Sequence, residues 1–264
     1  MCDSRPAMRR RSYPGTVGRR SMKGKTLRPA ATTMPLSAHR VAPGGSVRGG
    51  IVMLPGLRES DATIMELARR FAHERYVVLV PELVAGLGLD PQAAARAEQA
   101  WQDADLADDP TVGDVMAVMQ SPDYERWVMK ALRATVGELA KEPGVDTRIA
   151  VIGYGTGGGL AFALAAVDSR VRLALSYDCV ATDIDLVENI KGAAVSFYAA
   201  DNAAAAEGLP ELRAAMRRAG VPFCAKKYPG NLNTLRDLAA VGPQSALARD
   251  LWQRSLAMLR LHLA

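Results

Sequence analysis

One stretch of the chain limits its fold more than any other. Residues 149–167 contain no charged side chain, yet five glycines stand among them, at positions 153, 155, 157, 158 and 159. An apolar segment of this length could in principle cross a membrane as a helix, but a glycine cluster is typical of a tight turn. The stretch therefore predicts a buried strand, a sharp turn and a helix. We expect no membrane-spanning segment.

The rest of the chain shows the alternation of an α/β fold. Short runs of β-forming residues recur at residues 50–54, 76–80, 148–152, 172–177, 193–199 and 223–228. Between them lie segments with helical spacing of apolar residues, expected near residues 64–71, after 91, and at 127–142, 156–167, 210–219 and 244–262. This order predicts a mainly parallel, twisted sheet flanked by helices. Because we find no repeat or linker, we expect a single domain over residues 34–264.

The charge of the chain is distributed unevenly. Residues 1–33 hold nine basic side chains and one acid, whereas the remainder holds 24 basic and 27 acidic side chains and is mildly acidic. A nucleic-acid-binding domain needs a concentrated basic face to neutralise phosphates, so we expect no nucleic-acid partner. The three cysteines have neither metal-ligand nor redox spacing, and their sparse, odd number favours a reducing cytoplasm. We expect neither a metal nor a cofactor.

The basic segment 1–33 is a separate question. It has no apolar core and is therefore no secretory signal, and its Arg-rich, acid-poor composition only loosely matches an organelle transit peptide. It shows no hydrophobic periodicity. We interpret it as a disordered tail or as the result of a start codon assigned too early, with Met34 as the alternative start.

The glycine turn has the frame of a nucleophile elbow. In that motif a strand, a strained turn and a helix follow one another, small residues flank a central nucleophile, and backbone N–H groups face an oxyanion. Here Gly155 is central, between Tyr154 and Thr156, and we expect Gly56 and Leu57 to border the same region. Glycine tolerates a strained backbone but has no atom that can attack a carbonyl. The geometry is expected to remain without the chemistry.

The elbow and several strands resemble the dienelactone hydrolase family. That family has a Gly-Tyr-Cys-x-Gly-Gly elbow where this chain has Gly-Tyr-Gly-Thr-Gly-Gly at residues 153–158. Residues 48–54 resemble its first core strand, residues 76–83 its "gyvalaPdL" strand, and residues 89–92 with 98–100 the segment over its active site. The similarity extends over residues 34–264 and implies an α/β-hydrolase fold.

The resemblance also implies where the family's functional residues fall. Its nucleophilic cysteine corresponds to Gly155, its acid to Asp201 and its catalytic histidine to Asn233. A glutamate near its first strand corresponds to Gly56, and an arginine that binds substrate carboxylates would lie near Ala97. Only the acid is retained.

Few other residues could replace the lost groups. The chain has three histidines, His39, His73 and His262, and their positions in the sequence do not favour an approach to the elbow. Thr156 carries a hydroxyl beside the vacant position, but capping or packing at the start of a helix is the simpler interpretation. Glu59 lies on the first loop, where an acid is usually solvated.

Three functions remain open from the sequence. The first is a non-catalytic relative of the family that binds a small molecule or a partner protein. The second is an active ester or lactone hydrolase of altered mechanism, with Asp201 acting as a base through water. The third is a dinucleotide-binding protein, because Gly153, Gly155 and Gly158 satisfy Gly-x-Gly-x-x-Gly, with Asp178 near the place of a ribose-binding acid. We favour the first.

Overall fold

An eight-stranded sheet forms the centre of the molecule. The computed structural model describes residues 25–27, 36–57, 62–100, 109–178, 184–229 and 246–264. The strand order is β1-β2-β4-β3-β5-β6-β7-β8, in which β1 and β2 are antiparallel additions at one edge and all other pairs are parallel. The strands are β1 (Lys25–Leu27), β2 (Leu36–Val41), β3 (Gly49–Leu54), β4 (Tyr76–Pro81), β5 (Ile149–Tyr154), β6 (Val171–Tyr177), β7 (Ala193–Ala199) and β8 (Phe223–Tyr228).

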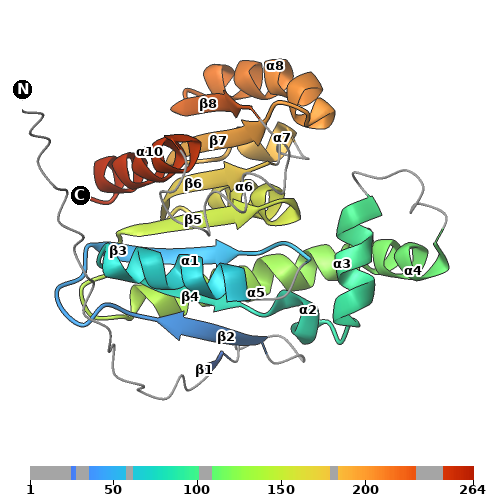
Figure 1. Ribbon diagram of the computed structural model, residues 1–264, viewed down its shortest axis with the longest axis horizontal. Helices are drawn as coiled ribbons and strands as arrows, with labels where there is room; N and C mark the ends of the chain where they lie inside the picture. The colour runs from blue at the N-terminus through green and yellow to red at the C-terminus, as the bar shows by residue number, and fades with distance from the viewer. Residues whose placement is uncertain (1–24, 28–35, 58–61, 101–108, 179–183, 230–245) are drawn as a thin grey trace, which may run out of the picture.

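Helices cover both faces of this sheet (Figure 1). The helices are α1 (Ala62–His73), α2 (Leu83–Gly86), α3 (Pro91–Ala100), α4 (Pro110–Met119), α5 (Pro122–Ala140), α6 (Thr156–Val167), α7 (Ile184–Val187), α8 (Ala203–Arg218) and α10 (Ala246–His262). Helices α1 and α10 pack on one face, and α5, α6 and α8 pack on the other. Helices α3 and α4 form a lobe that stands out beyond the carboxyl ends of the strands. In the described residues, we find no helix long and apolar enough for a membrane span.

The central strands are buried on both faces, as parallel strands covered by helices must be. In β3, Ile51 and Met53 face the α1 and α10 side, whereas Val52 and Leu54 face the α5 and α6 side. Full burial of each such side chain contributes about 1.5–3 kcal/mol, so the sheet is the main source of stability. The expected architecture, a mainly parallel sheet flanked by helices, is confirmed.

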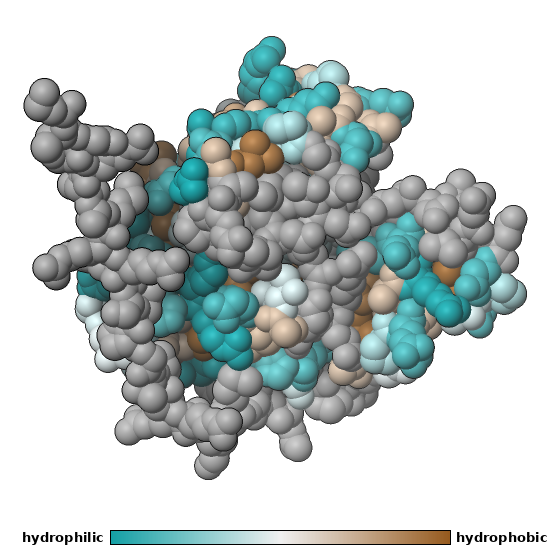
Figure 2. All heavy atoms as spheres, viewed as in Figure 1, coloured by the Kyte–Doolittle hydropathy of each residue, from teal (hydrophilic) through white to brown (hydrophobic). Residues whose placement is uncertain are grey.

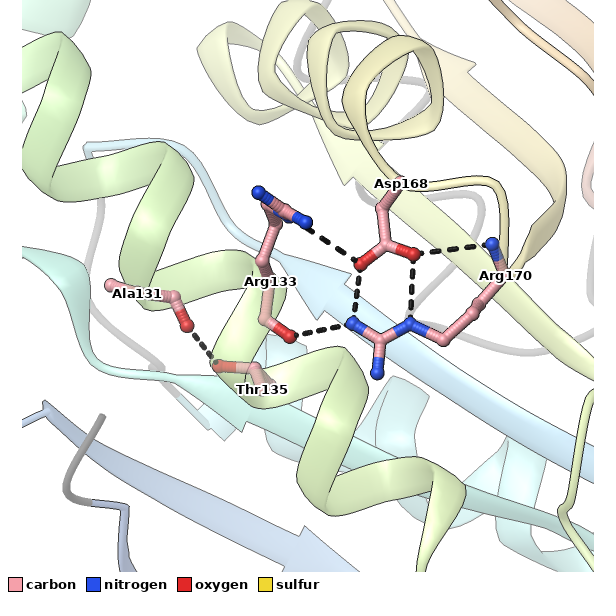
Figure 3. A network of polar contacts seen from close by, with 5 residues as sticks. All are labelled: Ala131, Arg133, Thr135, Asp168 and Arg170. Carbon is pink, nitrogen blue, oxygen red and sulfur yellow. Dashed lines mark hydrogen bonds and ion pairs between the residues drawn. The ribbon is translucent and has the colours of Figure 1, made fainter. Parts of the chain in front are cut away.

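A buried aspartate forms an ion pair with a partly exposed arginine at the C-terminal end of α6 (Figure 3). Asp168, which follows α6, is 4% exposed and accepts hydrogen bonds from Arg170 at 2.5 and 2.8 Å, while Arg133 of α5 lies 4.0 Å away. Burial alone would raise the pKa of Asp168, but the hydrogen bonds and charge of Arg170 outweigh it and lower that pKa. The pair ties α6 to α5 and to β6, and so holds the direction of α6.

Two expectations about the chain's local structure were wrong. The helix expected from residue 210 begins at Ala203, because Asn202 caps it by accepting a hydrogen bond from the N–H of Ala205 at 2.8 Å. Pro210 therefore lies inside α8 and not at its start. Residues 25–27, expected to belong to the disordered tail, pair with β2 as strand β1. Residues 1–24 and 28–35 lie outside the described part of the chain.

Candidate functional site

The turn between β5 and α6 has the strained backbone that the sequence predicted. Gly155 has φ 54° and ψ −127° and is the N-cap of α6. Its neighbours are small because α6 approaches the strands closely: a Cβ on Gly153 would lie 2.0 Å from the carbonyl oxygen of Gly157, and a Cβ on Gly157 would lie 2.3 Å from that of Leu54. The expected elbow geometry is therefore confirmed, with no side chain at its centre.

Several candidate residues meet at the carboxyl edge of the sheet. Gly56 and Leu57 follow β3 and are buried, and the N–H of Gly155 donates to the carbonyl oxygen of Tyr177 at the end of β6, at 2.9 Å. Asp201 follows β7 at the same edge, where its side chain is exposed. Carboxyl edges of open α/β sheets are where ligands bind. Gly56, Leu57, Gly155 and Asp201 therefore lie at the same edge of the sheet.

A glutamate that the sequence analysis did not assign to the site occupies the elbow. Glu98 of α3 is 6% exposed, and its Oε1 accepts hydrogen bonds from the N–H of Thr156 at 3.3 Å and from its hydroxyl at 3.2 Å. A Cβ built on Gly155 would lie 2.6 Å from this oxygen, and one on Gly56 would lie 2.5 Å from it. The carboxylate thus fills the space where the nucleophile of an elbow would stand.

The sequence held one signal for this role. Glu98 stands four residues after Ala94 and one after Ala97, on the buried face of α3. A carboxylate on the apolar face of a helix is rarely buried without partners, so its position indicated a specific contact. The resemblance to the family placed residues 98–100 over the active site, but it did not indicate which of them reaches the elbow.

Asp178, at the end of β6, is a second buried acid at this edge. It has φ 62° and is 9% exposed, and its Oδ1 accepts a hydrogen bond from the N–H of Ala199 at 2.6 Å. Burial, together with the nearby charge of Asp201, raises the pKa of Asp178 to about 7, against the opposing effect of the Ala199 hydrogen bond. The amide of Asn202 donates to its carbonyl oxygen at 3.0 Å. Asp178 therefore joins the ends of β6 and β7.

The sequence places Tyr154 beside the elbow, but its side chain points away from the elbow. Its side chain is buried on the α1 and α10 side of the sheet, where its ring stacks on Tyr177 with a centroid separation of 4.7 Å. Burial raises the pKa of this phenol well above its usual value. Because β-strand side chains alternate between faces, the tyrosine before the turn points into the core. Only the backbone of Tyr154 borders the elbow, where its carbonyl oxygen would lie 3.0 Å from a Cβ on Gly56.

The remaining candidates are placed as follows. Thr156 is the first residue of α6, and its hydroxyl binds Glu98. His39 pairs with Glu82 at 2.8 Å, and His73 and His262 lie in the last turns of α1 and α10, at the opposite edge of the sheet. Ala97 is buried in α3, while Glu59 and Asn233 fall outside the described residues. Among the residues that the structure describes, no three metal-binding side chains gather.

Proteins similar to this chain are known both in sequence and in structure. A protein of Saccharolobus solfataricus named as a carboxymethylenebutenolidase is 24% identical over 216 residues, covering 75% of this chain and 83% of its own length. A solved structure named as a dienelactone hydrolase, from Klebsiella pneumoniae subsp. pneumoniae, superposes with a TM-score of 0.68 at 20% identity, covering 90% of this chain and 97% of that one. A dienelactone hydrolase-like promiscuous phosphotriesterase from metagenomic libraries gives 0.66 at 14% identity, with coverages of 91% and 98%. The dienelactone hydrolase family model matches residues 37–263. This chain belongs to the dienelactone hydrolase family.

Proposed function

We propose that this chain is a non-catalytic member of the family, which has lost the nucleophile and the histidine and binds a small molecule or a partner protein at the carboxyl edge of its sheet. Gly155 stands at the nucleophile position and Asn233 at that of the histidine, while Asp201 is the remnant acid. Retention of the strained turn at φ 54° supports a site that keeps its shape without its chemistry.

One observation carries the proposal, namely the position of the Glu98 carboxylate. It lies 2.6 Å from where a Cβ of residue 155 would be, so the space of a nucleophile is already filled. It also accepts the hydrogen bond of the Thr156 N–H, the donor that an elbow directs at a developing oxyanion. A negative charge in this place repels both a thiolate and an oxyanion.

An active hydrolase of altered mechanism is the second candidate. The Thr156 hydroxyl lies 3.2 Å from Oε1 of Glu98, a separation at which a carboxylate can act as a base toward a hydroxyl group. Asp201, exposed at the same edge, is a further candidate base through water. We place this function second, because the same Glu98 oxygen occupies the Thr156 N–H and leaves that donor unable to stabilise a transition state.

A dinucleotide site is less well supported. In such a site, the pyrophosphate rests on the N-terminus of the helix after the glycine turn. Here Glu98 presents a carboxylate to that N-terminus, and Asp178, the expected ribose-binding acid, directs Oδ1 to the N–H of Ala199. Both observations weigh against a phosphate-bearing ligand at this turn.

The proposal is tested by mixing the native protein with excess 4-nitrophenyl acetate and following both product release and the intact mass. A non-catalytic protein gives neither a stoichiometric burst of nitrophenol nor a site-specific acetylated species. The Glu98→Ala and Asp201→Ala variants serve as references, because each removes one candidate base. Turnover by the native protein that either substitution abolishes would establish the altered-mechanism hydrolase in its place.

A further inference from the structure

We infer that Glu98 is an internal latch that holds the lobe formed by α3 and α4 closed over the elbow, so that the site at Gly155 becomes available only when this contact opens. This inference rests on the proposed function, because it assumes that the site at Gly155 binds a ligand and describes how that binding is regulated. The contact itself is independent of whether the protein catalyses a reaction.

Most of the buried apolar contacts of the lobe are between its own two helices, α3 and α4. Its two helices share a small apolar cluster with Leu57, in the loop after β3, and with Val84 of α2. The cluster's members in α3 and α4 are Ala93, Ala94, Ala97, Val112 and Val115. Buried alanine and valine side chains remove less apolar surface from water than the larger side chains of the main core, so they attach the lobe more weakly. In the space-filling view, the lobe protrudes from the body and is mainly hydrophilic on its outside (Figure 2).

The Glu98 contact provides a polar connection from this lobe to α6. It joins α3 to the first residue of α6 across 58 positions in sequence. Burying a carboxylate is costly unless charge-assisted hydrogen bonds offset the loss of water, and the two groups of Thr156 contribute such bonds. The N-terminus of a twelve-residue helix also favours a negative charge. The carboxylate is therefore stable in this position only while α3 is docked.

The closed position depends on two glycines. Side chains at Gly56 or Gly155 would place a Cβ 2.5 or 2.6 Å from Oε1 of Glu98, well inside van der Waals contact. A nucleophile at position 155 would therefore displace Oε1 of Glu98 from its present position. Glu98 can take this position because neither Gly56 nor Gly155 has a side chain.

Opening the latch would free the donors that a ligand needs. While Glu98 is in place, the N–H and hydroxyl groups of Thr156 are engaged and the space next to Gly155 is filled. A ligand for this site therefore binds only the open fraction of molecules, and its apparent affinity falls in proportion to that fraction. Substitutions that open the lobe are expected to raise ligand affinity without altering any ligand contact.

Hydrogen–deuterium exchange of the full chain tests the latch directly. In Glu98→Ala, amides of residues 91–100 should exchange at least about tenfold faster than in the native protein, the change expected for loss of a charged hydrogen bond. The matched control is Gln99→Ala, which alters the neighbouring, exposed residue of the same helix and should leave the rate unchanged. Amides of β5 report the core and should keep their protection in all variants.

A second variant covers the case in which Glu98→Ala loosens the whole fold. Glu98→Gln keeps the shape and an acceptor oxygen but removes the charge, so it should accelerate exchange in α3 severalfold and leave β5 unchanged. Equal exchange of α3 in native protein and both Glu98 variants would overturn the latch, as would an equal acceleration by Gln99→Ala. Hydrolysis by the native protein would refute the proposed function and would leave these exchange rates unaffected, so the two failures are distinguishable.

Discussion

Glu98 and Gly155 compete for one position in the molecule. Oε1 of Glu98 lies 2.6 Å from the point where a Cβ of residue 155 would stand. Glu98 belongs to α3, whereas Gly155 lies in the turn between β5 and α6. In the family elbow, that point carries the nucleophile. Residue 155 has no side chain, and the carboxylate of Glu98 from α3 fills the space that a side chain would take. The turn keeps its positive φ although it carries no nucleophile.

This competition predicts an energetic coupling between the two positions. Gly155→Ala should cost roughly 2–4 kcal/mol of unfolding free energy, because it adds strain at positive φ and displaces the Glu98 carboxylate from its hydrogen bonds. In a Glu98→Ala background only the strain remains, so the cost should fall by about 1 kcal/mol or more. Urea unfolding of the four proteins of this cycle measures the difference. Additive effects, within about 0.5 kcal/mol, would show that the two side chains do not meet.

Asp178 predicts a pH dependence of stability. Its pKa of about 7 in the folded protein lies above the ordinary value of 3.8, so the folded state holds a proton more tightly than the unfolded state. Its contribution is fully present below about pH 4 and is lost as pH rises through 7. Asp178→Asn, which is neutral at every pH, should remove this loss and gain a few kcal/mol relative to the native protein between pH 4 and 8.

Urea midpoints of the native protein and of Asp178→Asn, compared at each pH, measure this effect. Asp114→Asn is a suitable control for the substitution itself, because Asp114 is an exposed acid on α4. A constant difference between native protein and Asp178→Asn across this pH range would mean that the pKa of Asp178 is not raised in the folded state.

The glycine turn should not bind dinucleotides. Titration with NAD or NADP is expected to give no saturable signal at micromolar concentrations by calorimetry, since Glu98 presents a negative charge where the pyrophosphate would rest. Glu98→Ala is the informative variant, because it removes that charge while leaving the glycine pattern intact. Saturable binding by the native protein that disappears in Asp178→Ala would establish the dinucleotide function.

Local signals predicted most of the framework. The uncharged stretch around Gly155 and its glycines indicated a strand, a strained turn and a helix, because close helix approach and positive φ leave few alternatives to glycine. The start of α8 was predicted at Pro210 because proline is favoured at the first position of a helix. Here Asn202 caps the helix and the alanines after it begin the helix at Ala203, so Pro210 lies inside it. Strand β1 was missed because its pairing with β2 depends on an available sheet edge and not on its own three residues.

The site was harder to predict than the fold. The resemblance to the family motif assigns the nucleophile position to Gly155 and the acid to Asp201, and each of these residues follows a strand. Glu98 was assigned no role because its contact with Thr156 joins residues 58 positions apart, and no local pattern specifies where a side chain of α3 will end. The side chains of β5 alternate between the two faces of the sheet, and this alternation turns Tyr154 toward α1 and α10. The elbow motif alone does not indicate this direction.

We expect the elbow to lack hydrolytic activity, because residue 155 has no nucleophile and because Glu98 occupies that place. Steady-state hydrolysis of 4-nitrophenyl acetate and of a simple lactone tests it most directly, with the native protein, Gly155→Cys with Asn233→His, and the same pair with Glu98→Ala compared side by side. We predict no activity above background for the native protein, little for the double variant and a measurable gain for the triple variant, in which the thiol, its base and its space are all present. Robust hydrolysis by the native protein that Asp201→Ala abolishes would contradict the claim.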